Sequence, residues 1–277
     1  MRRGLLSLAV VSSLALSGCV GMGDFGLNAR ATVSESRPLA KDGRFELENV
    51  NGRVEVTGWD EAKVSIEATK HAATDRALED LRIEITDEGD RVSVHTRYPR
   101  PHWFGPGGRV DYVVRVPRTA RVKVANVNGH VEVERIAAQV AASTVNGSVQ
   151  VRDAESAVEA SSVNGGVEVA FARVGPEGRG SIRTTNGSAH LTLPADANAD
   201  DEARTVNGSV RCDFDLANES RTKRHLEGRI AAGGGRFELR SVNGSVSIDR
   251  GLSTRSASHE PAEAAHPPAE APAGQGR

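Results

Sequence analysis

An Asn-Gly pair occurs seven times in this chain, nearly always with a valine directly before it and another three residues after the Asn. The intervals between successive pairs are 77, 18, 18, 22, 21 and 36 residues. A recurring period near 20 is typical of stacked repeat arrays, in which each unit buries its apolar face against its neighbours. The pairs begin at Asn51, Asn128, Asn146, Asn164, Asn186, Asn207 and Asn243.

Residues on either side of each pair alternate as they do in strands. After the Asn, the third and fifth residues are apolar and the fourth is polar, as in Val149, Gln150 and Val151. Before the Asn, the fourth residue is apolar but the second is polar, as in Ala142 and Thr144. We interpret this as a change of phase. Because a slip of one residue turns side chains to the other face, we predict strand, corner, strand in each repeat.

Two architectures satisfy this pattern. In an antiparallel meander, each Asn-Gly is a type I′ hairpin turn, but Asp-Gly or Gly-Gly would serve equally well in some copies. In a parallel stack, equivalent residues lie ~4.8 Å above one another, and identical Asn side chains can bond from rung to rung. The column identity favours an all-β fold, a parallel β-solenoid with two or more strands per rung of about 18–22 residues. The meander is the alternative.

The intervals also indicate where the array is irregular. The last interval is twice 18, so we expect a rung without Asn-Gly around residues 224–228. The interval of 77 contains alternating segments and TDRALEDL (residues 74–81), which predicts one short helix with Thr74 or Asp75 as its N-cap. We therefore predict an irregular N-terminal β cap or sandwich over residues 39–121, followed by Asn-Gly repeats over residues 122–250.

Both termini read as segments outside the fold. Residues 1–18 carry two arginines and an apolar run that is too short to span a membrane, as in an export signal. The sequence LSGC before and at Cys19 resembles the lipobox of bacterial lipoproteins, which implies a lipid on Cys19. Val20 stands where the family's inner-membrane retention signal places Asp, so the outer membrane is preferred. We predict a flexible tether over residues 19–38 and a disordered Ala/Pro/Glu tail over residues 251–277.

One loop stands apart from the repeats. The sequence YPRPHWFGPGGR (residues 98–109) places aromatic rings beside arginines in a Pro- and Gly-rich setting. Exposed rings with arginine are typical of binding hot spots, whereas a lid folded onto the end of the stack is the structural alternative. The candidate partner-binding residues are Tyr98, Arg100, His102, Trp103 and Phe104.

Several segments together resemble a known family. They are VTGWDEAKVSIEATK, RVSVHTRYP, VDYVVRVP, LTLPADANAD and the repeated TVNGSV. This series is similar to the bacterial β-strand-repeat family of unknown function commonly labelled "putative adhesin", over residues 44–250. The resemblance implies a β-helix-like fold at the cell envelope and no catalytic residues.

The sequence shows no pattern typical of catalysis. The eight histidines lack metal-ligand spacing, and neither a nucleophile elbow nor a phosphate loop is present. The stacked Glu132, Gln150 and Glu168 fit a solvated strand face better than a cation site. A net charge of −2 gives no nucleic-acid footprint.

We therefore predict a non-enzymatic envelope lipoprotein without cofactor. It would serve in surface display, adhesion or scaffolding, held at the membrane by its lipid, with an envelope protein or glycan as partner. The alternatives are a polysaccharide-active β-helix enzyme and an envelope stress or signalling component that binds another envelope protein.

Overall fold

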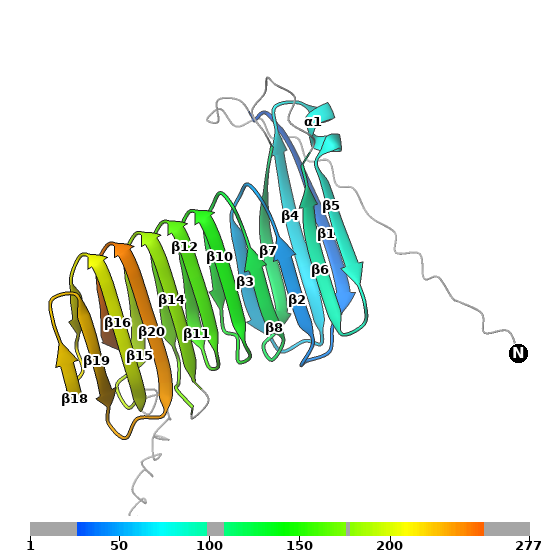
Figure 1. The fold of residues 1–277 in the computed structure, drawn as a ribbon. Coiled ribbons are helices and arrows are strands. Elements are labelled where there is room, and N and C mark those ends of the chain that lie inside the picture. The colour runs from blue at the N-terminus through cyan, green and yellow to red at the C-terminus, as the bar shows by residue number, and fades with distance from the viewer. Residues whose placement is uncertain (1–26, 99–107, 176–177, 252–277) are drawn as a thin grey trace, which may run out of the picture.

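The computed structural model describes residues 27–98, 108–175 and 178–251 (Figure 1). Within those ranges the only helix is α1 (Asp75–Asp80), and the remaining regular structure is strand. The all-β prediction is confirmed. The predicted short helix is also present, and the Thr74 side chain caps it by accepting a hydrogen bond from the backbone of Ala77 at 3.2 Å.

The strands form two long sheets. Sheet A contains the strands that follow the Asn-Gly pairs and, at its N-terminal end, three further strands. Its spatial order is β1 (Ala29–Pro38), β4 (Lys63–Ala72), β7 (Arg109–Pro117), β3 (Val54–Trp59), β9 (Val131–Glu134), β11 (Val149–Ala154), β13 (Val167–Phe171), β15 (Ala189–Pro194), β21 (Val246–Gly251) and β17 (Val210–Cys212). Sheet B contains the strands that precede the Asn-Gly pairs and two further strands at each end. Its spatial order is β18 (Leu216–Arg221), β19 (His225–Ile230), β16 (Ala199–Asn207), β20 (Gly235–Asn243), β14 (Arg179–Asn186), β12 (Val158–Asn164), β10 (Val140–Asn146), β8 (Arg121–Ala125), β2 (Arg44–Glu48), β6 (Arg91–Arg97) and β5 (Arg82–Asp87).

Neighbouring Asn-Gly repeats pair in parallel, one strand in each sheet. Asn146 lies opposite Asn164, and Val149 lies opposite Val167, so equivalent residues are in register. A hairpin meander would pair the same strands antiparallel. The strands accordingly lie side by side along one axis, with the Asn-Gly corners along one edge (Figure 1).

The order of the repeats in space differs from their order in the chain. Strand β20 lies between β14 and β16, so the repeat of Asn243 is inserted between those of Asn186 and Asn207. The expected rung at residues 224–228 is wrong. Residues 225–228 belong to β19, which runs antiparallel to β16 and pairs with β18 in a hairpin at the end of sheet B, and Arg224 directly precedes that strand. Because β19 joins sheet B by antiparallel pairing and does not cross to sheet A, it needs no corner, which is why that segment has no Asn-Gly.

The interior is one apolar cluster between the sheets, and it corrects our interpretation of the phase change. The residues two before each Asn are buried together with the apolar residues four before it, as shown by Thr144 and Ala142. The alternation therefore continues unchanged up to the corner. The valine directly before the Asn faces outward. The buried polar residues and the exposed valines are therefore neighbouring positions of the same corner.

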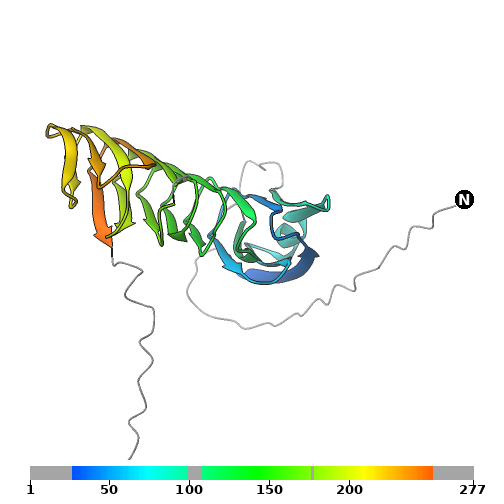
Figure 2. The ribbon, with the colours of Figure 1, turned by 90° about the horizontal axis from the view of Figure 1, so that it is seen from below.

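The N-terminal end is closed by antiparallel strands. Strand β1 pairs with β4 along its whole length, so the predicted flexible tether is wrong for residues 29–38. Strands β2 and β3, within the region predicted as a cap, pair in parallel with β8 and β9 and continue the stack. Lys70 on β4 donates to the backbone carbonyl oxygens of Leu78 and Leu81 at 2.9 and 3.1 Å and so holds the end of α1. Seen from below, the blue and cyan strands make this end rounded (Figure 2).

Candidate functional site

The corner asparagines form a continuous ladder. The side-chain amide of Asn128 donates to Asn51 at 2.7 Å, and each later bond in the ladder is 2.8 Å long. Every amide donates in the same direction, toward the β1 end. In space the ladder runs through Asn51, Asn128, Asn146, Asn164, Asn186, Asn243 and Asn207. The structure therefore brings all seven predicted corner residues together along one edge.

A second, buried ladder lies just inside the first. In every rung after the first, the polar residue two before the Asn donates to the carbonyl oxygen of the glycine in the adjacent rung, as Ser162 does to Gly147 at 2.7 Å and Thr184 does to Gly165 at 2.8 Å. In the first rung Asn49 donates to the carbonyl oxygens of Asn51 and Val110. These bonds satisfy polar groups that would otherwise be buried without partners. The sequence pattern contained this column, but we had interpreted it only as a change of phase.

Close packing explains why glycine follows each Asn. A Cβ added to Gly165 would lie 1.9 Å from the carbonyl oxygen of Gly147, and the other corner glycines meet an adjacent carbonyl at 2.0–2.2 Å. Such distances are far inside van der Waals contact. The corner backbones of successive rungs are therefore too close for any side chain at this position.

The residue before each Asn faces solvent and forms an apolar stripe beside the ladder. Val163 is 43% exposed and Val206 is 55% exposed, although valine is among the residues most often buried. In space the stripe runs through Val50, Val127, Val145, Val163, Thr185, Val242 and Val206.

A groove of about 920 Å³ runs across the outer face of sheet B beside this stripe. It is lined from six adjacent strands, β10, β12, β14, β20, β16 and β19. At a strand spacing of ~4.8 Å these strands span about 24 Å. Three arginines three positions before the Asn, Arg183, Arg240 and Arg204, lie in register on β14, β20 and β16. Arg224 and His225 complete the basic lining.

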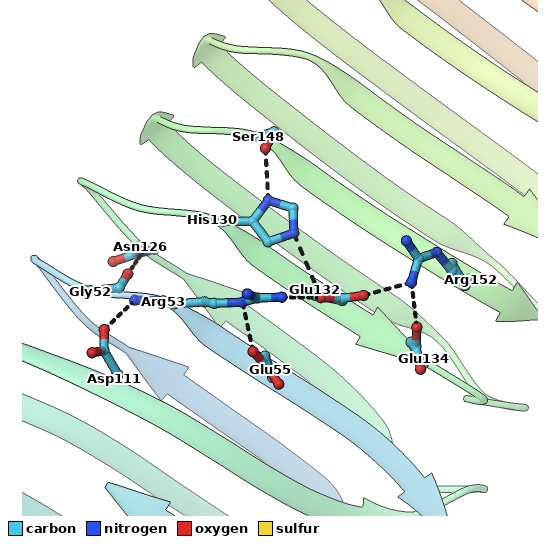
Figure 3. A network of polar contacts seen from close by, with 10 residues as sticks. All are labelled: Gly52, Arg53, Glu55, Asp111, Asn126, His130, Glu132, Glu134, Ser148 and Arg152. Atoms are coloured by element: carbon cyan, nitrogen blue, oxygen red, sulfur yellow. Dashed lines mark hydrogen bonds and ion pairs between the residues drawn. The ribbon is translucent and has the colours of Figure 1, made fainter. Parts of the chain in front are cut away.

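The outer face of sheet A carries a different arrangement, a self-neutralising ion network (Figure 3). Glu132 accepts from Arg53 and from Arg152, each at 2.7 Å, and Arg152 also reaches Glu134 at 2.7 Å. Burial alone raises the pKa of Glu132, but the hydrogen bond from Arg53 and the charge of Arg152 outweigh it and hold that pKa below its usual range.

The acidic residues of this ion network on sheet A are already paired with donors from the protein. His130 lies 3.8 Å from Glu132 and contacts Ser148 at 2.7 Å, while burial and the Arg53 charge lower the pKa of its imidazole. Gln150 donates to Glu168 at 2.9 Å, so the column of Glu132, Gln150 and Glu168 is bonded within itself and to arginine. No group of three or more His, Cys, Asp or Glu with the arrangement of a metal site occurs in the described ranges.

Of the five predicted partner-binding residues, the structure describes Tyr98 alone. Its hydroxyl accepts from the backbone N–H of Asn51 at 3.0 Å and lies 3.0 Å from the side-chain oxygen of Asn49. Tyr98 thus packs against the first corner, and burial raises the pKa of its phenol. The other predicted loop residues, Arg100, His102, Trp103 and Phe104, lie outside the described residues, as does Cys19.

Sequence reasoning missed one buried acid. Asp201 on β16 is 2% exposed, and neither carboxyl oxygen has a hydrogen-bond partner in the described structure. Burial, with a smaller contribution from Asp200, raises the pKa of Asp201 to about 7. It occupies an inward position opposite Phe237 in the adjacent rung, so the only signal was its place in that column.

None of the curated proteins is significantly similar to this chain. The described residues contain no helix with the length and apolarity needed to cross a bilayer.

Three solved structures are similar to it over most of their length. A "putative cell adhesion protein" from Clostridium sporogenes is 11% identical, with a TM-score of 0.45, over 79% of this chain and 100% of its own. A "putative adhesin" from Bacteroides fragilis is 9% identical, with a TM-score of 0.42, over 78% and 96%. A "putative lipid binding protein" from Parabacteroides distasonis is 12% identical, with a TM-score of 0.30, over 79% and 96%.

The family match covers the same part of the chain as the stacked strands. Residues 23–249 match the family described as Toastrack DUF4097. This chain belongs to the Toastrack DUF4097 family.

Proposed function

We propose that this chain is a non-enzymatic, lipid-anchored protein of the bacterial envelope that uses its stacked rungs for adhesion or scaffolding. In this proposal the rungs form a parallel β-solenoid, and β1, β4, β5 and α1 form its N-terminal cap. A lipid on Cys19 holds the protein in the membrane, preferably the outer one, and its partner is an envelope glycan or protein.

The observation that carries the proposal is the register of the rungs. Each outward position becomes a straight column of side chains at ~4.8 Å intervals, and the backbone behind it is hydrogen-bonded from rung to rung. A rigid, repeating surface of this kind is suited to binding an extended partner at several equivalent points.

The position of β1 relates the anchor to this surface. Ala29 pairs with Ala72 on β4, and the neighbouring His71 pairs with Arg109, which begins β7 on the corner side. The ten residues from Cys19 to Ala29 can extend at most about 35 Å. A lipid on Cys19 therefore keeps the corner edge of the N-terminal end near the membrane.

Metabolic labelling tests the anchor. Cells that express the full chain are given radioactive palmitate, and the protein is isolated from separated membranes. We expect label in the wild type and in Cys212→Ser, and none in Cys19→Ser. Label that persists in Cys19→Ser would contradict lipidation at this residue.

Two measurements test the role. A photo-crosslinking residue at Val163, on the outer edge of the stack, should capture an envelope component in intact cells, whereas the same residue at the inward Val149 should not. Incubation of the purified chain with envelope polysaccharides should leave them intact. Their cleavage would favour the enzyme alternative.

A further inference from the structure

We infer that the groove on sheet B binds a linear acidic polysaccharide, laid across the strands with its carboxylates on the arginine column. This inference rests on the proposed function, because it names the ligand class of the display surface. It depends on the charge of the groove, the spacing of its arginines and its shape.

The charge of the groove selects an anion. Arg183, Arg240, Arg204 and Arg224 are among the described residues that line it, together with His225, and none of those residues is acidic. The corresponding position in the earlier rungs is Glu48, Ala125, Ser143 or Ser161, so the arginine column is confined to the last rungs in space.

The arginines can exchange their present partners for a ligand. Arg204 pairs with Glu202 at 2.6 Å, Arg183 lies 3.3 Å from Glu238, and Arg240 also pairs with Glu238. Their side chains are about half exposed, and ion pairs of this kind contribute only about 0–1 kcal/mol. Arg224 has no ion pair in the described structure and is exposed. The carboxylates of a bound chain can therefore replace the glutamates as partners of these guanidinium groups at little cost in free energy.

The spacing selects a polymer with frequent, regular charges. In-register arginines on adjacent strands recur every ~4.8 Å across the sheet. An extended peptide presents side chains on one face only every ~6.6 Å, so its acids fall out of step with the column. A chain of uronic acid rings carries one carboxylate on every ring and matches a repeated basic column more closely.

The shape and the remaining lining agree with a sugar chain. The groove is long, and beside the arginines it offers valine methyl groups and hydroxyls, including Val163, Val242 and Ser161. Sugar rings present C–H faces and hydroxyl groups to such a surface. The described lining contains no Phe, Tyr or Trp side chain, whereas single-stranded nucleic acid is bound largely by stacking on aromatic side chains.

Calorimetric titration of the full chain in detergent with oligogalacturonates of defined length tests the inference. We expect binding that strengthens with length until the groove is filled and then levels off. Arg240→Gln should weaken it at least threefold, and the triple change Arg183→Gln, Arg240→Gln, Arg204→Gln at least tenfold. Arg211→Gln is the matched control, because Arg211 is exposed on sheet A in the same rung as Arg204, and it should change the affinity less than twofold.

Several results would overturn the inference. They are absence of binding, equal loss in Arg211→Gln, equal binding of neutral dextran, and binding of phosphatidylglycerol vesicles or an acidic peptide in place of the oligogalacturonate. Thermal unfolding of each variant shows whether it is folded, and the single Arg240→Gln variant serves if the triple variant is not. A failed titration with intact palmitate labelling and crosslinking would reject the ligand class alone and leave the proposed function standing.

Discussion

Asn243 donates its side-chain amide to Asn186 across 2.8 Å, although the two residues are 57 positions apart in the chain. The same residue accepts the amide of Asn207 at 2.8 Å, so it is an interior member of the ladder. The last repeat of the sequence is thus an inner repeat of the structure.

Replacing Asn243 by alanine should destabilise the fold by about 1–3 kcal/mol, because it removes two hydrogen bonds of about 0.5–1.5 kcal/mol each. Asn207→Ala is the matched control, since Asn207 ends the ladder and loses one such bond. Urea unfolding followed by circular dichroism measures both. If the last repeat lay at the end of the stack, Asn243→Ala would have the smaller effect.

Gly165→Ala should destabilise the protein by about 3 kcal/mol or more, because the new Cβ would lie 1.9 Å from the carbonyl oxygen of Gly147 and force the rungs apart. The adjacent Gly166 provides a sharp control, since a Cβ there has nothing nearer than 3.6 Å. Comparison of the two urea midpoints gives the answer. Equal effects would mean that the close approach of the corners does not limit this position.

Asp201 should make stability depend on pH. Its folded pKa is about 7, above the unfolded value of ~3.9, so the folded state retains a proton that the unfolded state releases. The contribution of Asp201 to stability is therefore greatest below about pH 4, declines as pH rises to about 7, and then levels off. The decline is on the order of a few kcal/mol, at about 1.4 kcal/mol per pKa unit.

The test is Asp201→Val, which places an apolar side chain at this inward position. Urea unfolding between pH 4 and pH 8 should show that the free energy of unfolding of this variant depends less on pH than that of the wild type and is higher at pH 7.5. Asp200→Asn is the comparison. It removes only the smaller contribution, that of the Asp200 charge, to the raised pKa of Asp201, so most of the pH dependence should remain. A slope unchanged in Asp201→Val would show that another group titrates.

Tyr98→Phe should destabilise the N-terminal corner by about 1–3 kcal/mol, because it leaves the partly buried backbone N–H of Asn51 without its acceptor. Asn49→Ala removes another partner of the same hydroxyl, so the double variant should lose less than the sum of the two single ones. Strict additivity in urea unfolding would contradict a shared network.

Much of this fold could be predicted from local pattern. The alternation around Val149 and Val151 specified strands, and the identity of the Asn column favoured rungs in register. The insertion of Asn243 could not be predicted, because pairing between strands is a long-range property and each repeat carries the same local signal. The arginine column was missed for a related reason: Arg183, Arg204 and Arg240 are isolated in the sequence and become neighbours only through the order of the rungs.

The inserted repeat sets an order on folding. A chain that emerges N-terminus first can add rungs one after another as far as β14 and β15. Strands β16 and β17 must then wait, since the strands that join them to the stack, β20 and β21, come last. The far end of the molecule therefore closes only after Gly235–Gly251 has been released, so a ribosome or translocon that still holds this segment keeps the protein open.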